Sequence, residues 1–582
     1  MIKIKKTFAI ISFMLSTTVI VAQTNSVGSY YYRLGENQKA KEYLNKELSS
    51  NPTEANFYLG EIAFKEGDMQ KAEEYYRKGL SISSEDINNN IGLLKLKLKT
   101  ETKEASANLD AYYYKYKKNA AVLQAIARAF LDNDMVKQAE DYLSKAKSAN
   151  DKNPDIYIIE GDIIMLGNDI KLAGNAAAKY EMAIYFAPDY PLGYLKVALM
   201  YEYISSRNSI EKLETLKEKQ PQLPVIYDML GKVYTQNGFY PEAIEAYQKV
   251  IASGIYSIMD VERYARSLYF SKQYEEAQKL VDLGLQKEPT HFVLNRYDMY
   301  IQSATDNIDI GLDIANKFFT MRDTGYISLD YSTYASMLKT AKRLDEAIIQ
   351  HDKALQIAPD ELNLYGEAAA TAREKRDYAM AAEYIRQLML KKAELAENPE
   401  GYEDNTADIN TLGYDYYSSG ATIARNQALA EELMKNDKII KEVLASDANL
   451  IEDSLKLSFD YFAKHYALYN LHKADAVFNT LIERIPDSYL GYRYKALTLH
   501  AINGETKDGL AKPYYEKVIE IITSGEEITS FQNRILLEAY NYLGYYYYVI
   551  KDNPNAIIYW NKVLEIDPEN ANAKLVLDAL NK

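Results

Sequence analysis

Apolar residues recur near the C-terminal end of the chain at the spacing of an α-helix. In the stretch NYLGYYYYVIKDNPNAIIYWNKVLEIDPEN, residues 541–570, Leu543, Gly544 and Tyr547 follow Tyr540 at offsets of three, four and seven. These offsets place the four residues on one face of a helix. The sequence therefore predicts a helix that packs through a mixed face of large and small residues.

A second helix is predicted directly after the first. The polar residues 551–553 form a short turn, and Ala556, Trp560 and Val563 then repeat at helical intervals until Pro568. Small Gly544 and Ala556 lie where two antiparallel helices must approach closely, while Tyr547 and Trp560 are large enough to fill the space beside them. Residues 540–568 are thus predicted to form a helical hairpin.

The same pattern recurs along nearly the whole chain. The stretch VIYDMLGKVYTQNGFYPEAIEAYQKVI repeats every position of the pattern, and ANFYLGEIAFKEGDMQKAEEYYRKGL repeats most of them. Copies are marked by these residues: Gly28, Tyr31, Ala40 and Pro52; Leu59, Gly60, Ala72 and Tyr76; Ala127, Ala139 and Ala146; Tyr227, Leu230, Gly231, Tyr234, Ala243, Tyr247 and Val250; Ala265, Ala277 and Pro289; Tyr334, Ala335, Ala347, Ala354 and Pro359; Ala474, Phe478, Leu481 and Pro486.

This pattern resembles the tetratricopeptide repeat, a helix–turn–helix unit of 34 residues. The resemblance implies an all-α fold, an α-solenoid wound as a right-handed superhelix of about 12–14 units. It also implies that the first helices line a concave face and the second helices lie outside. Two units are predicted to have longer turns, around MLGNDIKLAG and INGETKDG, and residues 91–118 and 306–321 fit the repeat poorly.

The array is interrupted once and ends in a different helix. Residues 394–410, ELAENPEGYEDNTADIN, are acidic and carry Pro399 and Gly401. We predict a repeat array over 23–393, an acidic loop with irregular helices over 394–452, and a second array over 453–582. The interruption is either a linker between two solenoids or an insertion in one. The last segment, with Leu575, Leu577 and Leu580, is predicted to be a capping helix.

The N-terminus resembles a secretory signal. Lys3, Lys5 and Lys6 precede an apolar stretch from Phe8 to Ala22, which is short for a membrane span and contains hydroxyl residues. We predict a signal peptide over residues 1–22. An uncleaved anchor is the alternative. Cleavage would leave a chain without a spanning segment, exported to the periplasm or envelope of a Gram-negative bacterium.

Composition excludes several classes of function. The formal net charge of −15 and the pI near 5.1 argue against nucleic acid as a partner, because phosphate binding needs a basic surface. The absence of cysteine removes disulfides, thiolate nucleophiles and cysteine-bound zinc. No nucleotide-binding glycine motif, zinc-protease motif or nucleophile elbow occurs, and the acidic start of LDNDMVKQAEDY lacks the glycine of a calcium-binding loop.

Few residues remain as candidates for chemistry. His465 and His472 lie two helical turns apart, a weak metal site, and His351 occupies a position where other copies carry a large packing residue. The acidic segment 394–410 fits a solvated loop better than a cation site. We therefore predict no enzyme, no cofactor and no metal, with a catalytic site hidden near 394–450 as the weakest alternative.

The surface is unusual in its tyrosine content, with 54 tyrosines among 582 residues. This abundance suits a recognition groove, since tyrosine buries a large area, but it is equally compatible with a compositional bias. Repeat geometry implies partner-binding positions on the first helices, namely Phe57, Glu61, Phe64, Arg266, Tyr269, Asn541, Tyr545 and Tyr548. One subgroup of the family grips a C-terminal carboxylate through Lys and Asn at fixed positions of the first helices. Here those positions hold other combinations, such as Phe57 with Glu61 and Asn541 with Tyr545, so that ligand is not expected.

These features predict a non-catalytic scaffold of the cell envelope that binds other proteins in a concave, Tyr-rich groove. An accessory protein that binds glycan or peptidoglycan by aromatic stacking is the alternative. The single tryptophan, Trp560, weakens that alternative, because tryptophan is the preferred platform for sugars.

Overall fold

The computed structural model describes residues 26–399, 402–445, 459–525 and 527–580. Within these ranges every regular element is a helix and no strand occurs. The predicted signal peptide, residues 1–22, lies outside the described residues. The chain divides into two compact units, residues 1–301 (unit 1) and 302–582 (unit 2). The array boundaries predicted from the sequence stay predictions.

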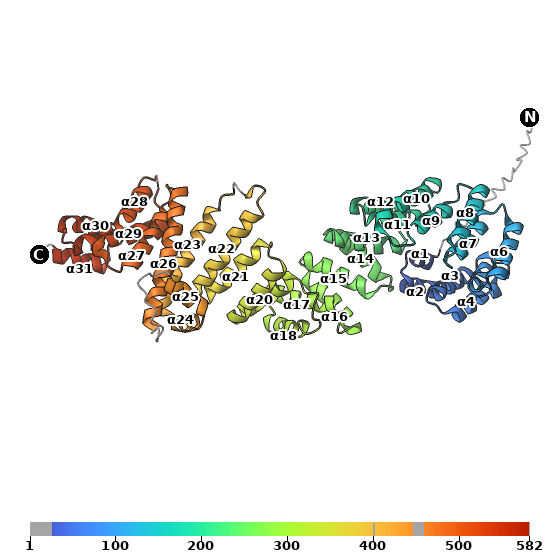
Figure 1. Cartoon of the computed structure of the whole chain (residues 1–582), viewed down its shortest axis with the longest axis horizontal. Helices are drawn as coiled ribbons and strands as arrows, with labels where there is room; N and C mark the ends of the chain where they lie inside the picture. The colour runs from blue at the N-terminus through green and yellow to red at the C-terminus, as the bar shows by residue number, and fades with distance from the viewer. Residues whose placement is uncertain (1–25, 400–401, 446–458, 526, 581–582) are drawn as a thin grey trace, which may run out of the picture. The chain divides into compact units, whose positions relative to one another are not determined.

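Unit 1 is built of successive helix pairs (Figure 1, blue to green). Its helices are α1 (Val27–Arg33), α2 (Asn37–Glu47), α3 (Pro52–Lys65), α4 (Met69–Ile82), α5 (Ile87–Lys97), α6 (Thr102–Tyr116), α7 (Ala120–Leu131), α8 (Val136–Ala149), α9 (Pro154–Ile164), the 3-10 helix η1 (Ile170–Leu172), α10 (Ala173–Phe186), α11 (Pro191–Tyr201), α12 (Ser206–Lys219), α13 (Pro224–Gln236), α14 (Tyr240–Ala252), α15 (Ile258–Phe270) and α16 (Tyr274–Lys287).

Helix α17 (Phe292–Ala304) lies at the boundary, and unit 2 continues the helical pattern with one departure. Its helices are α18 (Ile308–Phe318), α19 (Ser328–Thr340), α20 (Leu344–Ile357), α21 (Leu362–Glu374), α22 (Tyr378–Glu394), α23 (Thr406–Thr422), η3 (Ile423–Arg425), α24 (Gln427–Leu433), α25 (Asp437–Ala445), α26 (Phe459–Arg484), α27 (Tyr489–Asn503), η4 (Thr506–Asp508), α28 (Lys512–Thr523), α29 (Ser530–Val549), α30 (Asn553–Ile566) and α31 (Ala571–Leu580).

The helices pair as the sequence predicted. Within the described residues, thirteen hairpins have their two helices packed together, from α1–α2 to α15–α16 in unit 1 and from α19–α20 to α29–α30 in unit 2. In the hairpin of α23 the packing partner is α26, with the short helices α24 and α25 inserted between them. The all-α solenoid and its approximate number of units are thereby confirmed.

Small residues allow the two helices of a hairpin to approach closely. A Cβ added to Gly60 on α3 would lie 2.5 Å from a ring carbon of Tyr76 on α4. A Cβ on Gly544 would likewise lie 2.9 Å from the Trp560 ring. The second helices contribute alanines that are fully buried, namely Ala72, Ala243, Ala277, Ala347, Ala474 and Ala556. The repeated glycines and alanines are therefore packing residues.

Several turns within hairpins share one geometry. Lys551, between α29 and α30, has a φ of 64°, and Lys272 and Lys342 take the same left-handed conformation at the equivalent turns. Asp552 then caps α30, because its carboxylate accepts a hydrogen bond from the amide of Asn555. This left-handed residue followed by a cap reverses the chain within about three residues.

Several local predictions can be compared with the structure. The two longer turns are present, and each contains a 3-10 helix, η1 or η4. The poorly matching segments 91–118 and 306–321 are largely helical, as α5, α6 and α18. The acidic segment 394–410 lies between α22 and α23 and contains the start of α23.

The capping helix α31 packs on α30, but one of its predicted packing residues is wrong. Leu577 is buried together with Ala573, whereas Leu575 is 70% exposed. Ala573 and Leu577 are four residues apart and share the face toward α30, and Leu575 lies on the opposite side of the same helix. The face of α31 that packs on α30 therefore contains Ala573 and Leu577, and Leu575 does not contribute to it.

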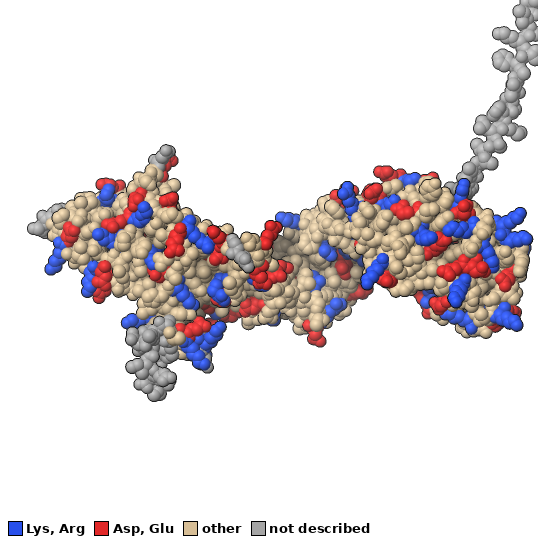
Figure 2. Space-filling view, turned by 45° about the horizontal axis from the view of Figure 1, so that its top comes forward, with Lys and Arg blue, Asp and Glu red and all other residues tan. Residues whose placement is uncertain are grey.

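The surface carries charge of both signs. On the face seen in Figure 2, Lys and Arg side chains alternate with Asp and Glu side chains, without a continuous basic stripe. None of the described helices combines the length and the apolar character needed to cross a bilayer.

Candidate functional site

Charged side chains on neighbouring first helices of unit 1 pair with one another. Glu61 binds Lys95 at 2.5 Å, and Asp162 binds Arg128 at 2.7 Å and Lys196 at 3.0 Å. Each pair joins residues 34 positions apart, which is the length of one repeat. Equivalent positions of successive first helices therefore lie side by side, and their alternating charges satisfy each other.

This pairing buries two of the residues predicted to bind a partner. The Glu61 carboxylate accepts hydrogen bonds from the hydroxyls of Tyr32 and Tyr76 and is 3% exposed. Phe64 is 8% exposed, and the Lys95 ammonium lies 4.3 Å from the centre of its ring. Neighbouring repeats therefore bury both Glu61 and Phe64 in this conformation.

The first hairpin of unit 1 also contacts repeats far along the chain. On α1, Arg33 donates to Asp155 at the start of α9 at 3.0 Å, across 122 residues of sequence. The Tyr190 hydroxyl donates to the same carboxylate at 2.6 Å. Helix α1 further contacts α13, so unit 1 closes on itself instead of contacting only nearest neighbours.

A buried ion-pair cluster completes this closure. Lys39 on α2 lies between Asp228 on α13 and Asp260 on α15, and its ammonium donates to both carboxylates, at 2.8 Å to Asp260. All three side chains are at least nine-tenths buried. Asp260 also completes the capping box of α15, since its carboxylate accepts from the amide of the N-cap residue Ser257 at 2.6 Å. We refer to Asp228 and Asp260 as the acid pair.

The electrostatic environment of the cluster gives the two carboxyls of the acid pair different pKa values. Burial, reinforced by the nearby Asp260 carboxylate, raises the pKa of Asp228 to about 6. Burial acts in the same direction on Asp260, but Lys39 and the hydrogen bonds from Ser257 outweigh it and lower the pKa of Asp260. Burial opposes the charge on Lys39, and the acid pair overcomes that cost and raises the pKa of Lys39. Asp228 is therefore the carboxyl of the pair that protonates first.

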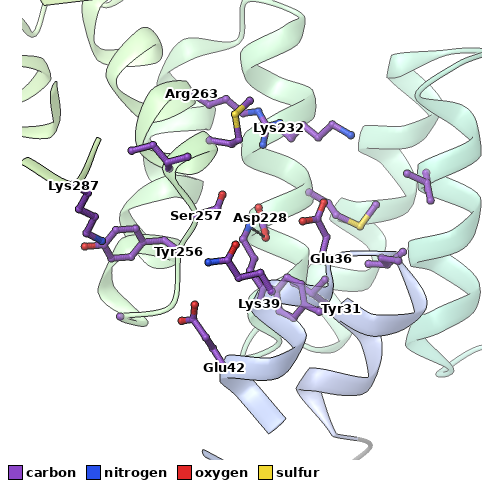
Figure 3. Close-up of a pocket in the computed structure, with 18 of the residues that line it drawn as sticks. Tyr31, Glu36, Lys39, Glu42, Asp228, Lys232, Tyr256, Ser257, Arg263 and Lys287 are labelled. Carbon is purple, nitrogen blue, oxygen red and sulfur yellow. Dashed lines mark hydrogen bonds and ion pairs between the residues drawn. The ribbon is translucent and has the colours of Figure 1, made fainter. Parts of the chain in front are cut away.

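A cavity of about 540 Å³ lies beside the cluster (Figure 3). One wall comes from the first hairpin and includes Tyr31, Glu36 and Glu42, and the opposite wall comes from α11, α13, α15 and the end of α16. In Figure 3, Lys39 and Asp228 lie at its centre. The cavity exists because the first hairpin touches distant repeats of unit 1.

The other predicted partner-binding residues of unit 1 lie apart from this cavity. Phe57 is half-buried, with its ring against the rings of Tyr58 and Tyr76. Arg266 is half-buried near the ring of Phe270. Tyr269 is half-buried in an aromatic cluster, with ring centroids 5.7 Å from Tyr297 and 5.6 Å from Tyr300.

Three predicted residues lie in unit 2, on one face of α29. Tyr545 is 50% exposed and Tyr548 is 41% exposed. Asn541 is half-buried, and its amide donates to the carbonyl of Leu537. These three residues are brought together by helical spacing. Whether any of the eight predicted residues contacts a partner stays a prediction.

Lys39 and the acid pair were not predicted as site residues. The helical pattern identifies neighbours within and between adjacent hairpins, whereas Lys39 and Asp228 are 189 residues apart. A usable signal was present in the first helices, where charged residues occupy positions that other copies fill with apolar ones. Asp228, for instance, takes the place that Phe57 occupies in the second hairpin.

No group of three or more His, Asp or Glu side chains in the described part of the chain is placed to hold a metal ion. His465 and His472 both belong to α26. His351 is 2% exposed and its Nε2 lies 3.0 Å from the Thr371 hydroxyl, which confirms its assignment as a packing residue.

Comparison with known proteins agrees with this architecture. Residues 28–87 match the family model described as tetratricopeptide repeat. None of the curated proteins matches the chain in sequence.

Several solved structures are similar to the chain. The C-terminal part of a TPR repeat-containing protein from Cytophaga hutchinsonii is 22% identical, with a TM-score of 0.33, covering 59% of this chain and 96% of that one. A tetratricopeptide repeat protein from Parabacteroides merdae is 16% identical, with a TM-score of 0.30, covering 43% and 98%. Pseudomonas aeruginosa pilF is 14% identical, with a TM-score of 0.29, covering 42% and 96%.

The hairpins, the close contacts between glycine and aromatic residues, and the 34-residue spacing of the inner ion pairs agree with the family match. The chain is a helical repeat protein, and its residues 28–87 match the model of the tetratricopeptide repeat family.

Proposed function

We propose that the chain is a non-catalytic scaffold, exported to the cell envelope of a Gram-negative bacterium, that binds partner proteins through the exposed face of α29. Tetratricopeptide repeats indicate a protein–protein interaction scaffold, and this coarser function follows from the family match. The envelope location rests on the signal-like residues 1–22 alone.

The observation that supports α29 is one helix face whose two ends are exposed, with the half-buried Asn541 between them. Phe531, Arg534, Asn541, Tyr545 and Tyr548 follow one another at steps of three, four or seven residues, which is one face of a helix. Phe531 is 47% exposed, and the Arg534 guanidinium lies 5.5 Å from the centre of its ring. Aromatic and Arg side chains are the types enriched in protein interfaces.

Unit 1 offers less of this kind of surface along its first helices. Its inner charged positions are engaged with each other, and Glu61 and Phe64 are buried. We therefore assign partner binding to the Tyr-bearing face of α29 instead of a groove that runs the whole length of the chain.

The test is crosslinking in cells followed by affinity purification of a C-terminally tagged protein from separated fractions. The double variant Tyr545→Ser/Tyr548→Ser should lose a recurring set of envelope proteins that the unaltered protein recovers. The matched control is Tyr114→Ser/Tyr185→Ser, since both of these tyrosines are 74% exposed and lie on α6 and α10. Circular dichroism checks that both variants remain folded.

Three results would count against the proposal. Recovery of the same proteins by both double variants would remove α29 as the binding face. Recovery of the tagged protein in the cytoplasmic fraction would reject the envelope location. Retention of the protein on cell-wall polysaccharide without any associated protein would favour the glycan-binding alternative.

A further inference from the structure

The cavity of unit 1 has an excess of carboxylates that have no cation of their own. Glu36 directly before α2, Glu42 on α2 and Glu288 directly after α16 line it. All three are exposed, and none forms an ion pair with another described residue. Glu202 also lines it and binds Lys232 through one oxygen at 2.7 Å. Its other oxygen, Oε1, is buried without a hydrogen-bond partner in the described structure, and the side chain is 9% exposed.

The cations that line the same cavity are largely engaged. Lys39 binds the acid pair, and Lys232 binds Glu202. The ammonium of Lys287 lies over the ring of Tyr256, 4.5 Å from its centre. Arg263 lies 3.8 Å from an oxygen of Asp260. The charged groups that remain available to a ligand are therefore mainly carboxylates.

Helix ends of both polarities line the cavity, since the N-terminal end of α15 (Ser257, Ile258 and Met259) lies there together with two C-terminal ends. Gly254 follows the end of α14, and Glu288 follows the end of α16, and both residues line the cavity. The last carbonyls of a helix have no partners inside the helix and carry partial negative charge, which favours a cation or a hydrogen-bond donor. The N-terminal end of α15 opposes this effect, so the preference for a positively charged group rests on the unpaired carboxylates of Glu36, Glu42 and Glu288.

Apolar residues line the space between these charges. Leu34 on the first hairpin faces a wall that includes Leu199, Val225, Met229 and Met259. A Lys or Arg side chain has a long apolar stem with a charge at its tip, and it can bury the stem while the tip meets a carboxylate. A cavity of about 540 Å³ exceeds a single side chain, so a short stretch of peptide fits it better than one residue alone.

We propose that this cavity binds a basic segment of a partner protein, with a Lys or Arg side chain directed at Glu36, Glu42 and Glu288. The inference deepens the proposed scaffold function and rests on it, because it gives one partner a chemical character. The net charge of −15 adds long-range attraction for such a segment. Because the two walls come from the first hairpin and from α11–α16, a bound segment bridges them and stabilises the closed form of unit 1.

The test uses the full-length protein and three blocked nine-residue peptides in which every third residue is lysine, glutamine or glutamate in an alanine background. Isothermal titration at low salt should rank the lysine peptide above the glutamine peptide, and the glutamine peptide above the glutamate peptide. The double variant Glu42→Gln/Glu288→Gln should weaken binding of the lysine peptide about fivefold, as expected for two partly exposed charge contacts. The matched control, Glu104→Gln/Glu140→Gln, removes the same charge from exposed sites on α6 and α8 and should leave the affinity unchanged.

Hydrogen exchange locates the bound peptide. The lysine peptide should slow amide exchange in α2 and in α15 together, since it touches both walls. Equal losses of affinity in both double variants would overturn the inference, because they would indicate attraction to the acidic surface in general. Tighter binding of the glutamate peptide would overturn it as well, and would assign Arg263 and Lys287 to an anionic ligand.

The outcome also separates this inference from the scaffold proposal. If the lysine peptide fails to bind while partners that depend on α29 are still recovered from cells, the basic-segment inference is wrong and the scaffold function stands. If the peptide binds with the expected exchange pattern while no partners depend on α29, the cavity is confirmed and the assignment of α29 is wrong.

Discussion

Replacing Lys39 by alanine should destabilise unit 1 strongly. The substitution leaves Asp228 and Asp260 buried together without the cation that lies between them. Removing one partner of a buried ion pair typically costs about 3–5 kcal/mol, because the remaining charge stays uncompensated in a medium of low dielectric. The free energy of unfolding of unit 1 should fall by an amount in this range.

The natural control is Lys41→Ala, on the same helix. Lys41 binds Glu66 at 2.7 Å, but both side chains are 40% exposed or more. A surface pair of this kind contributes about 0–1 kcal/mol. Hydrogen exchange followed peptide by peptide should show faster opening of α2, α13 and α15 in Lys39→Ala, and little change in Lys41→Ala.

The dependence on pH gives a second, independent check. Without Lys39, both carboxyls of the acid pair have raised pKa values in the folded protein, so the folded state binds protons more readily than the unfolded state. The free energy of unfolding of Lys39→Ala then falls as pH rises. Its loss of stability relative to the unaltered protein should therefore be larger at pH 8 than at pH 5. The role assigned to the cluster would be refuted if Lys39→Ala lost no more stability than Lys41→Ala. It would also be refuted if the loss of stability in Lys39→Ala did not depend on pH.

Two further predictions concern unit 2 and the packing of the repeats. Burial, with a smaller effect of Lys339, lowers the pKa of His351 to about 4, so the folded state should lose stability as pH falls from about 6.5 toward 4, by about 3 kcal/mol at most. Urea unfolding at pH 7 and pH 4.5 should show a weaker pH dependence of stability in His351→Leu than in the unaltered protein. An equal pH dependence in both proteins would contradict this prediction. Gly60→Ala should cost about 1–3 kcal/mol, because its Cβ would overlap the Tyr76 ring, whereas Gly366→Ala on α21, with nothing within 4 Å, should gain about 0.5–1 kcal/mol. Thermal unfolding should therefore shift in opposite directions in the two glycine variants, and equal shifts would contradict the packing argument.

The sequence predicts the hairpins well because the interactions that define them are local. Gly60 and Tyr76 are 16 residues apart, and Gly544 and Trp560 have the same separation, so a pattern read along the chain captures both contacts. The burial of His351 was equally predictable, since it takes the place of a packing residue in a helix of known register.

The closure of unit 1 could not be predicted in this way. It depends on the small rotation between successive hairpins, summed over several repeats, and no periodicity in the sequence reports that sum. The partner of Lys39 is therefore invisible to pattern analysis, as is the burial of Glu61 and Phe64 between adjacent repeats. Tyr545 and Tyr548 were placed correctly on one helix face, because that assignment needs only the spacing within α29.

The contact between Lys39 and the acid pair has a consequence for the order of events during synthesis. Asp228 leaves the ribosome 189 residues after Lys39. At about 5–20 residues per second this interval is roughly 10–40 s, during which the first hairpins can already fold and stack. The closed form of unit 1 thus cannot form before Asp228 has been translated, and a chain that stops earlier would present the ammonium of Lys39 to solvent or to chaperones.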